Sequence, residues 1–418
     1  MIAADGVFVG ISELATLAVG PVPRRGPAMG ELGIVPNAAL AIRQGRIVWT
    51  GAERQLRRQV RLAGGRRPVD LGGRAVLPGF VDAHTHLLFA GDRHREITWK
   101  LEGLSYSEIA RQGGGIYSTV TATRRASDAE LVRSALDRLR RMHSWGTTTA
   151  EVKSGYALTL EGELRLLRLV PRLARASGVN LVPTFLGAHA VPPEYADRAD
   201  VYIDQLVERW LPRVARAGLA RFCDVFCEPG FFDVAQSEKL LFAAARLGFG
   251  LKVHADEFHA LGGAALAARV EARSAEHLLT TPSSEYPQLA SAGVVAVLAP
   301  VTPFAALSAL RSPGRELVDA GVPVALGTDL SPNSWVEAMP LVLAHAVYDA
   351  RLSPSEAITA STVNAAYAIA EEERAGQLAP GRPADFSVFP VEHAVEVPYR
   401  FGTLPARVYR RGKLVFSR

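Results

Sequence analysis

The sequence predicts an α/β protein: a (β/α)8 TIM barrel with a second, small β-sandwich-like domain built from both chain ends. Three observations support this fold. The 418 residues are 48% hydrophobic and 21% charged, which is a globular composition. Short apolar runs alternate with longer amphipathic segments through the middle of the chain, and strand-like runs gather at both ends. We therefore expect residues 76–375 to form the barrel domain, and residues 1–75 and 376–418 to form the composite β-domain.

Short strand patterns separated by turn residues occupy both ends of the chain. Gly72 and Gly73 follow one of them, and residues 381–383 mark the boundary before the C-terminal group. Pairing of the two ends in one small domain is the economical arrangement. The predicted end strands cover residues 6–10, 38–42, 46–51, 69–71, 384–389 and 408–416.

Eight apolar runs in the middle of the chain predict the barrel strands, and helical patterns lie between most of them. A capping box at residues 127–130 opens a helix that Gly146 can end. Other predicted helices cover residues 164–176, 237–247 and 354–370. The predicted barrel strands are residues 76–82, 147–152, 181–186, 222–227, 250–254, 273–277, 294–299 and 322–328.

Charge and hydropathy exclude two broad classes of function. The formal net charge of +5 is small for this length, and no basic stripe is interleaved with aromatic residues, so we expect no nucleic-acid partner. The most apolar stretch, residues 294–307, is broken by prolines and is too short to span a membrane. Asp5 and Glu13 interrupt the N-terminal apolar stretch, so we expect no signal peptide, no membrane partner and a cytoplasmic location.

The chain holds two cysteines, Cys223 and Cys227. If residues 222–227 form a strand, the two thiols lie roughly 13 Å apart. A disulfide cannot span that distance. Two free thiols fit a reducing compartment, which agrees with the expected location.

Five of the ten histidines fall at or just past the carboxyl ends of predicted strands, where the active site of such a barrel lies. Asp329 also ends a predicted strand. Each residue alone could be an ordinary polar side chain where a strand meets a loop. It is improbable that the polar residues at the ends of strands one, five, six and eight of one barrel are all incidental. The five histidines are His84, His86, His189, His254 and His277.

Four of these side chains are predicted to hold one divalent ion. His84 and His86 are two residues apart, so in a strand both point to the same face. Imidazole and carboxylate ligands suit Zn²⁺ or Fe²⁺, and we expect His84, His86, His254 and Asp329 as ligands. A water completing the shell would be acidified to a pKa of about 7. Glu228 could ligate a second ion, but a single metal is favoured.

Several short sequence segments (here called words) resemble those of known protein families. The words at residues 78–86 and 381–388, with the histidines and the aspartate above, look like the amidohydrolase superfamily. Some related hydrolases bridge two metals with a modified Lys at the end of strand four, and no Lys stands there. Further words resemble the imidazolonepropionase family, and the resemblance covers essentially the whole chain. Those words are residues 89–93, 112–116, 151–156, 184–189, 224–228 and 253–258.

The resemblance implies a hydrolytic reaction. Imidazolonepropionases open the ring of 4-imidazolone-5-propanoate with water to give N-formimino-L-glutamate, the third step of histidine catabolism. The expected partner is therefore a small molecule, an imidazolone that carries a propionate. By analogy with the superfamily a homodimer is possible.

The resemblance also implies roles for residues near the predicted strand ends. Arg93, whose planar fork can hold a carboxylate, is expected to bind the propionate. Tyr156 and His189 are expected to contact the imidazolone. Tyr106 is a further candidate, for which packing is an equal alternative.

Three residues are expected to take part in catalysis. Glu257 can take a proton from the bound water or hand one to a ring nitrogen, and it also contacts the substrate. A helix N-terminal glutamate is the alternative interpretation of Glu257. His277 would steady the attacked carbonyl or the hydroxide, and Asp329 could accept a proton while ligating the metal.

One stretch departs from the commonest form of the family. That form has Asn two positions and Gly four positions after the aspartate of strand eight, where this chain has Ser331 and Asn333. Ser331 can still donate and accept hydrogen bonds but is shorter than Asn, and Ser334 keeps a hydroxyl. Ser331, Asn333 and Ser334 are expected to contact the substrate.

Two other enzyme activities and one non-enzymatic role compete with this interpretation. Another cyclic amidohydrolase or a nucleobase deaminase would share the metal ligands, because one scaffold hosts many reactions. Arg93, Tyr156 and His189 distinguish an imidazolonepropionase from these enzymes, since a nucleobase carries no propionate for Arg93 to bind. A non-catalytic binding protein on an inherited barrel would have lost ligands, and none is lost here.

Overall fold

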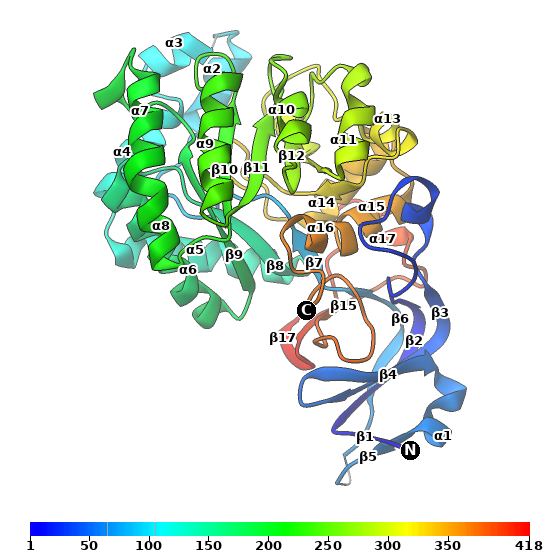
Figure 1. Cartoon of the computed structure of the whole chain (residues 1–418). Helices are drawn as coiled ribbons and strands as arrows, with labels where there is room; N and C mark the ends of the chain where they lie inside the picture. Colours follow the sequence, from blue (N-terminus) through cyan, green and yellow to red (C-terminus); the bar gives the residue numbers. More distant parts are fainter. Residues whose placement is uncertain (65, 105) are drawn as a thin grey trace.

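The computed structural model describes residues 1–64, 66–104 and 106–418. These residues form a parallel sheet of eight strands, a mixed sheet of seven strands and a two-stranded parallel sheet. Figure 1 shows the eight-stranded sheet surrounded by helices and the other two sheets beside it, where both chain termini lie. The expected α/β architecture, a barrel with a second β-structure from both chain ends, is confirmed.

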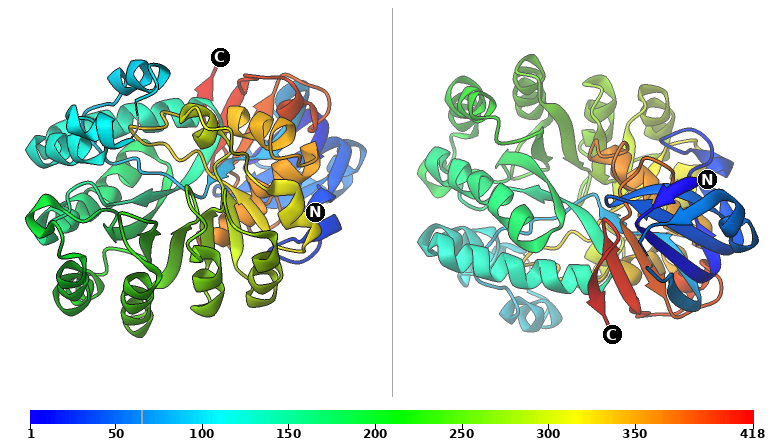
Figure 2. Two further views of the ribbon diagram at one scale, coloured as in Figure 1. Left: turned by 90° about the horizontal axis from the view of Figure 1, so that it is seen from above. Right: turned by 90° about the horizontal axis from the view of Figure 1, so that it is seen from below.

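The eight parallel strands are ordered as they occur in the chain and nearly close into a barrel. Figure 2 shows them inside a ring of helices. Between the first and last strands, Ala83 N donates to Leu326 O at 3.2 Å and Asp329 N donates to His84 O at 3.0 Å. Gly327 permits this approach, because a Cβ there would lie 2.6 Å from His84 Cβ. The strands are β7 (Phe80–Asp82), β8 (Thr147–Lys153), β9 (Asn180–Ala188), β10 (Phe222–Cys227), β11 (Gly250–Ala255), β12 (Ser274–His277), β13 (Val295–Leu298) and β14 (Val324–Leu326).

The prediction that residues 76–82 form one barrel strand is wrong. Val76, Leu77 and Pro78 end β6 (Val69–Pro78), which pairs with β15 (Phe386–Phe389) in the mixed sheet, and the barrel strand begins only at Phe80. Gly79 lies between them, where a Cβ would be 2.3 Å from Thr148 Oγ1. The whole run is buried, so its apolar pattern carries no signal of the change of partner.

The helix signals are confirmed where a cap was recognised. Ser127 caps α5, with Glu130 N donating to Ser127 Oγ at 3.3 Å and Ser127 N donating to Glu130 Oε2 at 2.8 Å. Gly178, with φ 73°, ends α6. The helix predicted at residues 354–370 is instead two helices, because Thr362 leaves helical geometry with φ −130° and ψ −94°.

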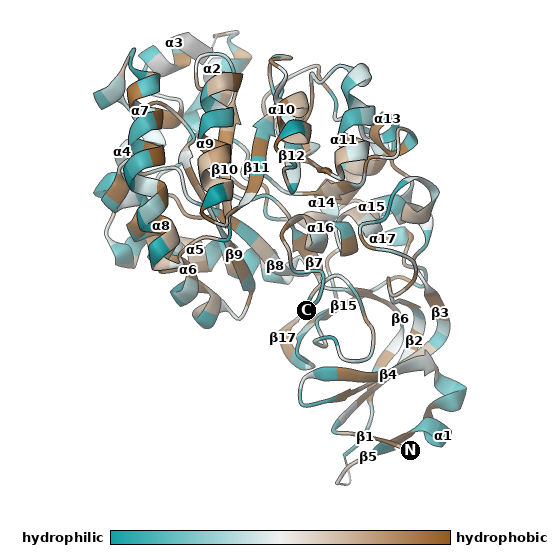
Figure 3. Cartoon of the chain, in the orientation of Figure 1, coloured by the Kyte–Doolittle hydropathy of each residue, from teal (hydrophilic) through white to brown (hydrophobic). Residues whose placement is uncertain are grey.

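The helices surround the barrel strands, apart from α1 and α17, which belong to the chain ends (Figure 1). In Figure 3 the outer helices carry both hydrophilic and hydrophobic residues, as expected for helices that bury one face. Within the described residues, every helix is too short or too polar to cross a bilayer. The helices are α1 (Leu56–Gln59), α2 (Arg95–Leu101), α3 (Tyr106–Arg111), α4 (Ile116–Arg125), α5 (Asp128–Ser144), α6 (Leu160–Ser177), α7 (Ala199–Gln205), α8 (Leu211–Ala217), α9 (Val234–Arg246), α10 (Gly263–Arg269), α11 (Tyr286–Ala292), α12 (Val301–Ala305), α13 (Gly314–Asp319), α14 (Met339–Tyr348), α15 (Pro354–Ala360), α16 (Val363–Ala368) and α17 (Glu396–Tyr399).

The mixed sheet joins the two chain ends in the order β17-β16-β15-β6-β2-β3-β4. Its core includes Phe8, Phe386 and Tyr409, whose ring centroids lie 4.6–5.0 Å apart. The strand predicted at residues 408–416 is a hairpin of two strands. The remaining strands are β1 (Ile2–Ala4) and β5 (Val60–Leu62), which pair with each other, and β2 (Gly6–Ala15), β3 (Ile34–Arg43), β4 (Arg46–Ala52), β16 (Arg407–Arg410) and β17 (Lys413–Ser417).

Both cysteines lie on β10 and are buried free thiols. The expectation that they do not form a disulfide is confirmed. Burial raises the pKa of Cys227 to about 11, so this thiol stays protonated and unreactive at neutral pH.

Candidate metal centre and active site

Four side chains converge at the carboxyl ends of the barrel strands. His84 and His86 follow β7, His254 lies on β11, and Asp329 follows β14. The Nε2 atoms of His84 and His86 are 3.2 Å apart, and those of His86 and His254 are 3.4 Å apart. Asp329 Oδ1 lies 3.4 Å from His84 Nε2 and 3.5 Å from His86 Nε2.

These distances match the spacing of ligands around one metal ion. In a tetrahedral shell with metal–nitrogen bonds of about 2.0–2.1 Å, neighbouring ligand atoms are about 3.3–3.4 Å apart. Three imidazole nitrogens and one carboxylate oxygen form a donor set that suits zinc or iron. The structure therefore brings His84, His86 and Asp329 close enough to share an ion, with His254 Nε2 3.4 Å from His86 Nε2. His84, His254 and His277 are also close enough to share one.

The protonation of these groups also suits metal binding. All four residues are at most 6% exposed. Burial and the neighbouring cationic groups hold the pKa values of His84 and His86 well below the usual range, so both rings are neutral and their lone pairs can bind a metal. Burial raises the pKa of Asp329 to about 6, and its Oδ2 accepts a hydrogen bond of 3.0 Å from Thr302.

His277 and Glu257 lie next to this cluster. His277 ends β12, and its Nε2 is 3.8 Å from Glu257 Oε2. Burial, Asp329 and Glu228 raise the pKa of the Glu257 carboxyl well above its usual value. A carboxyl group with a raised pKa in an active-site cavity is suited to exchange protons near neutral pH.

Unusual backbone conformations hold two of these residues. His277 has φ 71° and Asp329 has φ 50°, in the left-handed region that side chains with a Cβ rarely adopt. Such backbone strain gathers at functional sites, because the surrounding fold must enforce it. The loop that carries Glu257 is shaped by Asp256, whose Oδ1 accepts backbone N–H groups of Leu261 and Gly263 at 3.0 and 2.9 Å.

A cavity of about 480 Å³ opens above the cluster. Among the predicted substrate residues, Ser331 and Asn333 line it, whereas Ser334 is fully buried and is not among the described residues that do. The side chain of Tyr106 lies outside the described residues. The lining consists of His86, Arg93, Lys100, Leu104, Ile109, Ile116, Tyr156, His189, Phe226, Glu228, Pro229, Phe231, His254, Glu257, Phe258, His259, His277, Ala306, Asp329, Ser331 and Asn333.

The cationic side chains of Arg93 and Lys100 line the cavity, and only Arg93 was expected there from the sequence. Arg93 donates from Nε and Nη2 to Glu96 at 2.7 and 2.6 Å. Lys100, on α2, donates from Nζ to Asn333 Oδ1 at 2.9 Å. Burial and the positive charge of Arg93 lower the pKa of Lys100. An anionic group in the cavity would offset both effects.

Tyr156 and His189 form an aromatic wall beside the cluster. The His189 ring stacks on His86 with centroids 4.9 Å apart, and the Tyr156 ring is 5.1 Å from His189. His189 Nδ1 donates to Gly155 O at 3.1 Å, so Nε2 is the accepting nitrogen. Glu163 shapes the loop that carries Tyr156, because its carboxylate accepts backbone N–H groups on both sides of this residue.

Glu228 lines the cavity but is already engaged. Its Oε1 lies 2.7 Å from His259 Nδ1, and its Oε2 accepts the N–H of Phe258 at 3.2 Å. These two contacts fix the loop after β11 against the end of β10. Neither partner was recognised in the sequence, because a histidine outside the strand ends carries no local signal of its role.

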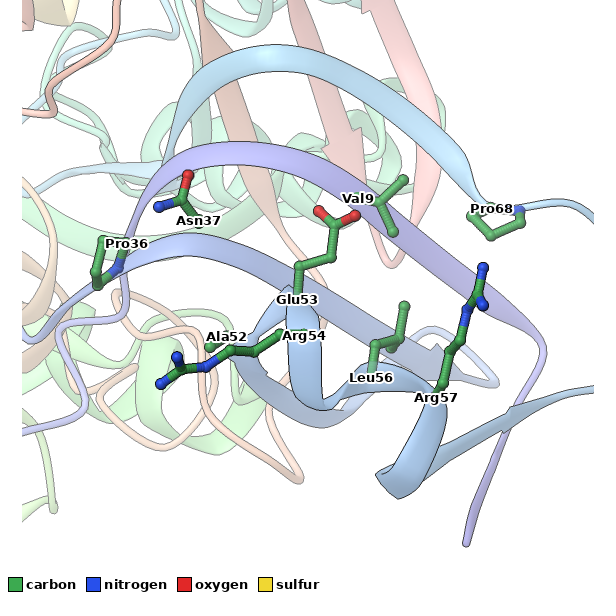
Figure 4. Close-up of a pocket in the computed structure, with 9 residues that line it drawn as sticks. All are labelled: Val9, Pro36, Asn37, Ala52, Glu53, Arg54, Leu56, Arg57 and Pro68. Carbon is green, nitrogen blue, oxygen red and sulfur yellow. The ribbon is translucent and has the colours of Figure 1, made fainter.

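A larger cavity, of about 920 Å³, lies against the mixed sheet and outside the barrel (Figure 4). In Figure 4 the Arg54 and Arg57 side chains point to opposite ends of it. Glu53 accepts the N–H of Gly10 at 2.9 Å. Its lining includes no histidine or cysteine, so it offers no donor set like that of the barrel. The lining consists of Val9, Pro36, Asn37, Ala52, Glu53, Arg54, Leu56, Arg57 and Pro68.

A nearly closed (β/α)8 barrel with a buried His/Asp cluster at its strand ends defines a metal-binding hydrolase of the amidohydrolase class. The model of the amidohydrolase family matches residues 204–416. The chain belongs to the imidazolonepropionase family, whose members are hydrolases of histidine degradation. It is 49% identical to the imidazolonepropionase of Symbiobacterium thermophilum over 98% of this chain and 97% of that protein. It is 42% identical to that of Bacillus velezensis, over 99% and 97%.

Solved structures with the same fold are more distant in sequence. A 5-methylcytosine deaminase from Klebsiella pneumoniae has a TM-score of 0.73 and 16% identity, covering 99% of this chain and 98% of that one. An adenosine deaminase from Xanthomonas campestris with bound zinc has a TM-score of 0.72 and 19% identity, covering 100% and 94%. At this identity the likeness concerns the fold alone.

Proposed function

We propose that this chain hydrolyses the ring C–N bond of 4-imidazolone-5-propanoate to give N-formimino-L-glutamate. The observation that carries the proposal is one cavity that joins the four-ligand cluster to the cationic side chains of Arg93 and Lys100. The reaction needs a hydrolytic centre at one end of the substrate and recognition of a carboxylate at the other. Sequence identity of 49% and 45% with two imidazolonepropionases, over nearly the full length of the chain, supports the same substrate.

One divalent ion, zinc or iron, would be held by His84, His86, His254 and Asp329. When bound, it lowers the pKa of a ligated water to about 7 and so makes a nucleophile available at neutral pH. The lysines beneath the cluster support a single ion. Lys252 Nζ lies 2.9 Å from Glu276 and 3.1 Å from Glu151, so ammonium groups fill the space between the other buried carboxylates.

Arg93 and Lys100 bind the propionate in this proposal. Both line the cavity, where Glu96 orients the guanidinium of Arg93 and Lys100 donates to the neutral amide of Asn333. Asn333 and Ser331 lie beside Lys100 and the cluster, where they can hydrogen-bond to the substrate. Tyr156 and His189 contact the imidazolone ring, which their aromatic faces can stack against.

Glu257 moves the proton. It takes a proton from the attacking water and delivers it to the ring nitrogen as the bond between this nitrogen and the carbonyl carbon breaks. His277 stabilises the oxyanion that develops on the attacked carbonyl, because it lies beside Glu257 on the same side of the cluster. Asp329, with its raised pKa, is the second candidate for the base.

The test is a hydrolysis assay with freshly prepared imidazolonepropionate, followed by loss of its ultraviolet absorbance. The proposal predicts turnover by the metal-loaded protein, loss of turnover after chelation, and recovery when zinc or iron is returned. His84→Ala should lose both metal and turnover. Absence of turnover by protein that holds one ion per chain would refute the proposed substrate.

A further inference from the structure

A network of five buried ionisable side chains lies inside the barrel, directly beneath the metal-binding cluster. All five are fully buried. They come from β8, β10, β11 and β12, of which the last three are adjacent and β8 is separated from β10 by β9, and none belongs to the ligand set or the cavity lining described above. The network consists of Glu151, Lys153, Asp224, Lys252 and Glu276.

Two of the carboxylates face metal ligands. Glu276 Oε2 is in hydrogen-bond contact with Nδ1 of His84. Asp224 Oδ2 lies 3.0 Å from Nδ1 of His254, an ion-pair contact whose angle falls outside hydrogen-bond geometry. In both rings this is the nitrogen opposite the Nε2 atom that points into the cluster. An ionised carboxylate can only accept, so the Glu276 contact requires a proton on Nδ1 of His84, and the closeness of Asp224 favours the same tautomer of His254, with the lone pair of each ring on Nε2.

The two lysines hold the carboxylates in place. Lys153 Nζ lies 2.7 Å from Asp224 and 2.9 Å from Glu151. Lys252 Nζ lies 2.9 Å from Glu276 and 3.1 Å from Glu151. Glu151 therefore bridges the two lysines, and the five groups form one connected chain. Burial lowers the pKa of Lys153, but the three carboxylates raise it above its usual value, so its ammonium stays charged.

Such a network is not explained by fold stability alone. Desolvating five charges costs several kcal/mol for each ion, and apolar side chains of similar volume often serve a core equally well. The alternative that it is a second metal site is excluded by its lysines. His84, Glu151 and Glu276 are close enough to share an ion, but Lys252 Nζ already lies between the two carboxylates.

We propose that Asp224 and Glu276 are positioning residues for the metal centre, which fix the tautomer and ring orientation of His254 and His84. The inference rests on the ligand set assigned under the proposed function. His86 provides a contrast, because its only ion pair among the described residues is through Nε2, to Asp329, and none joins its Nδ1 to a carboxylate. Two of the three histidines are thus held from behind by a carboxylate, and each carboxylate is anchored by its own lysine.

Glu151 offers a matched control. It is equally buried, contacts the same two lysines, and would lose the same charge on substitution. None of the hydrogen bonds and ion pairs among the described residues joins it to an imidazole. Loss of its charge perturbs the network as much as loss at Asp224 or Glu276, while both histidine contacts remain.

The experiment measures the Zn²⁺ affinity of the purified full-length protein by competition with a chromophoric chelator, and the melting temperature of the metal-free form. Asp224→Asn and Glu276→Gln should weaken affinity about 10- to 100-fold. Glu151→Gln should lower the melting temperature comparably but change affinity by less than about threefold. Equal affinity losses in all three variants, or none in any, would overturn the inference.

Three further outcomes are distinguishable. If Glu276→Gln does not fold, Glu276→Gln combined with Lys252→Met removes the unpaired ammonium and must show the same affinity loss for the inference to stand. If the unmodified protein itself binds no Zn²⁺ or Fe²⁺ tightly, the proposed metal centre fails together with this inference. Tight binding by the unmodified protein and by every variant would overturn the positioning role alone.

Discussion

Glu257→Gln separates proton transfer from every other property of the site. The substitution keeps the size of the side chain and most of its hydrogen bonding but cannot carry a proton. Glu257 is buried beside His277 and lies outside the four-ligand cluster, so metal content should not change. Its pKa is raised by burial and by Asp329, which suits an acid–base group near neutral pH. Loss of such a group lowers kcat by about 10²–10⁴, or about 2.7–5.4 kcal/mol of transition-state stabilisation.

The assay compares kcat, KM and metal content in three proteins. Glu371→Gln is the control, because Glu371 is also a buried carboxylate but pairs with Arg221 and Asn180 at the opposite end of the barrel. We expect the fall in Glu257→Gln mainly in kcat, with zinc or iron retained and binding of a substrate analogue preserved. A kcat within threefold of the unmodified protein would refute the role of Glu257 and move the base to Asp329. Loss of metal would show that Glu257 belongs to the ligand shell.

Three further predictions follow from the cavity, the cluster and the core. Lys100→Met should lower kcat/KM for imidazolonepropionate by about 10- to 100-fold, and Arg93→Lys, which loses the planar guanidinium, should do the same. Equal losses of kcat/KM with a ring analogue that lacks the carboxylate would exclude recognition of the propionate by these two residues. Elemental analysis should find about one ion per chain, and an ion at 1,000 times its Kd should stabilise the fold by about 4 kcal/mol; a requirement for two ions would contradict the mononuclear site. Burial and Arg410 lower the pKa of His143 to about 4 from 6.5. As the pH falls, His143 is therefore protonated in the unfolded chain before it is protonated in the folded one, and up to about 3 kcal/mol of the free energy of unfolding present above pH 6.5 is lost by pH 4. In urea titrations at several pH values, His143→Leu should lack this part of the dependence of the free energy of unfolding on pH. An unchanged dependence in this variant would refute the prediction.

Regular local patterns made much of the fold predictable. The strand end near His254 was readable because an apolar-rich run stops there, and the two-residue spacing of His84 and His86 puts both on one face. The capping box at Ser127 was readable because its hydrogen bonds are local. These signals depend on residues within a few positions of one another.

Long-range features could not be predicted in the same way. The division of residues 76–82 between two sheets depends on partners far along the chain. Lys100 carries no local signal of its role in the sequence, and only the folded chain brings it to Asn333. Lys153 and Lys252 lie on strands, and no nearby sequence pattern predicts which carboxylates they pair with.

Identification of the reaction product tests the central claim most directly. The metal-loaded protein is mixed with imidazolonepropionate, and the products are identified by mass spectrometry with a parallel assay for ammonia. Ring hydrolysis predicts N-formimino-L-glutamate in an amount equal to the substrate consumed, with no ammonia released, and no product from the chelated protein. Release of ammonia, or product formation that does not depend on metal, would contradict this account.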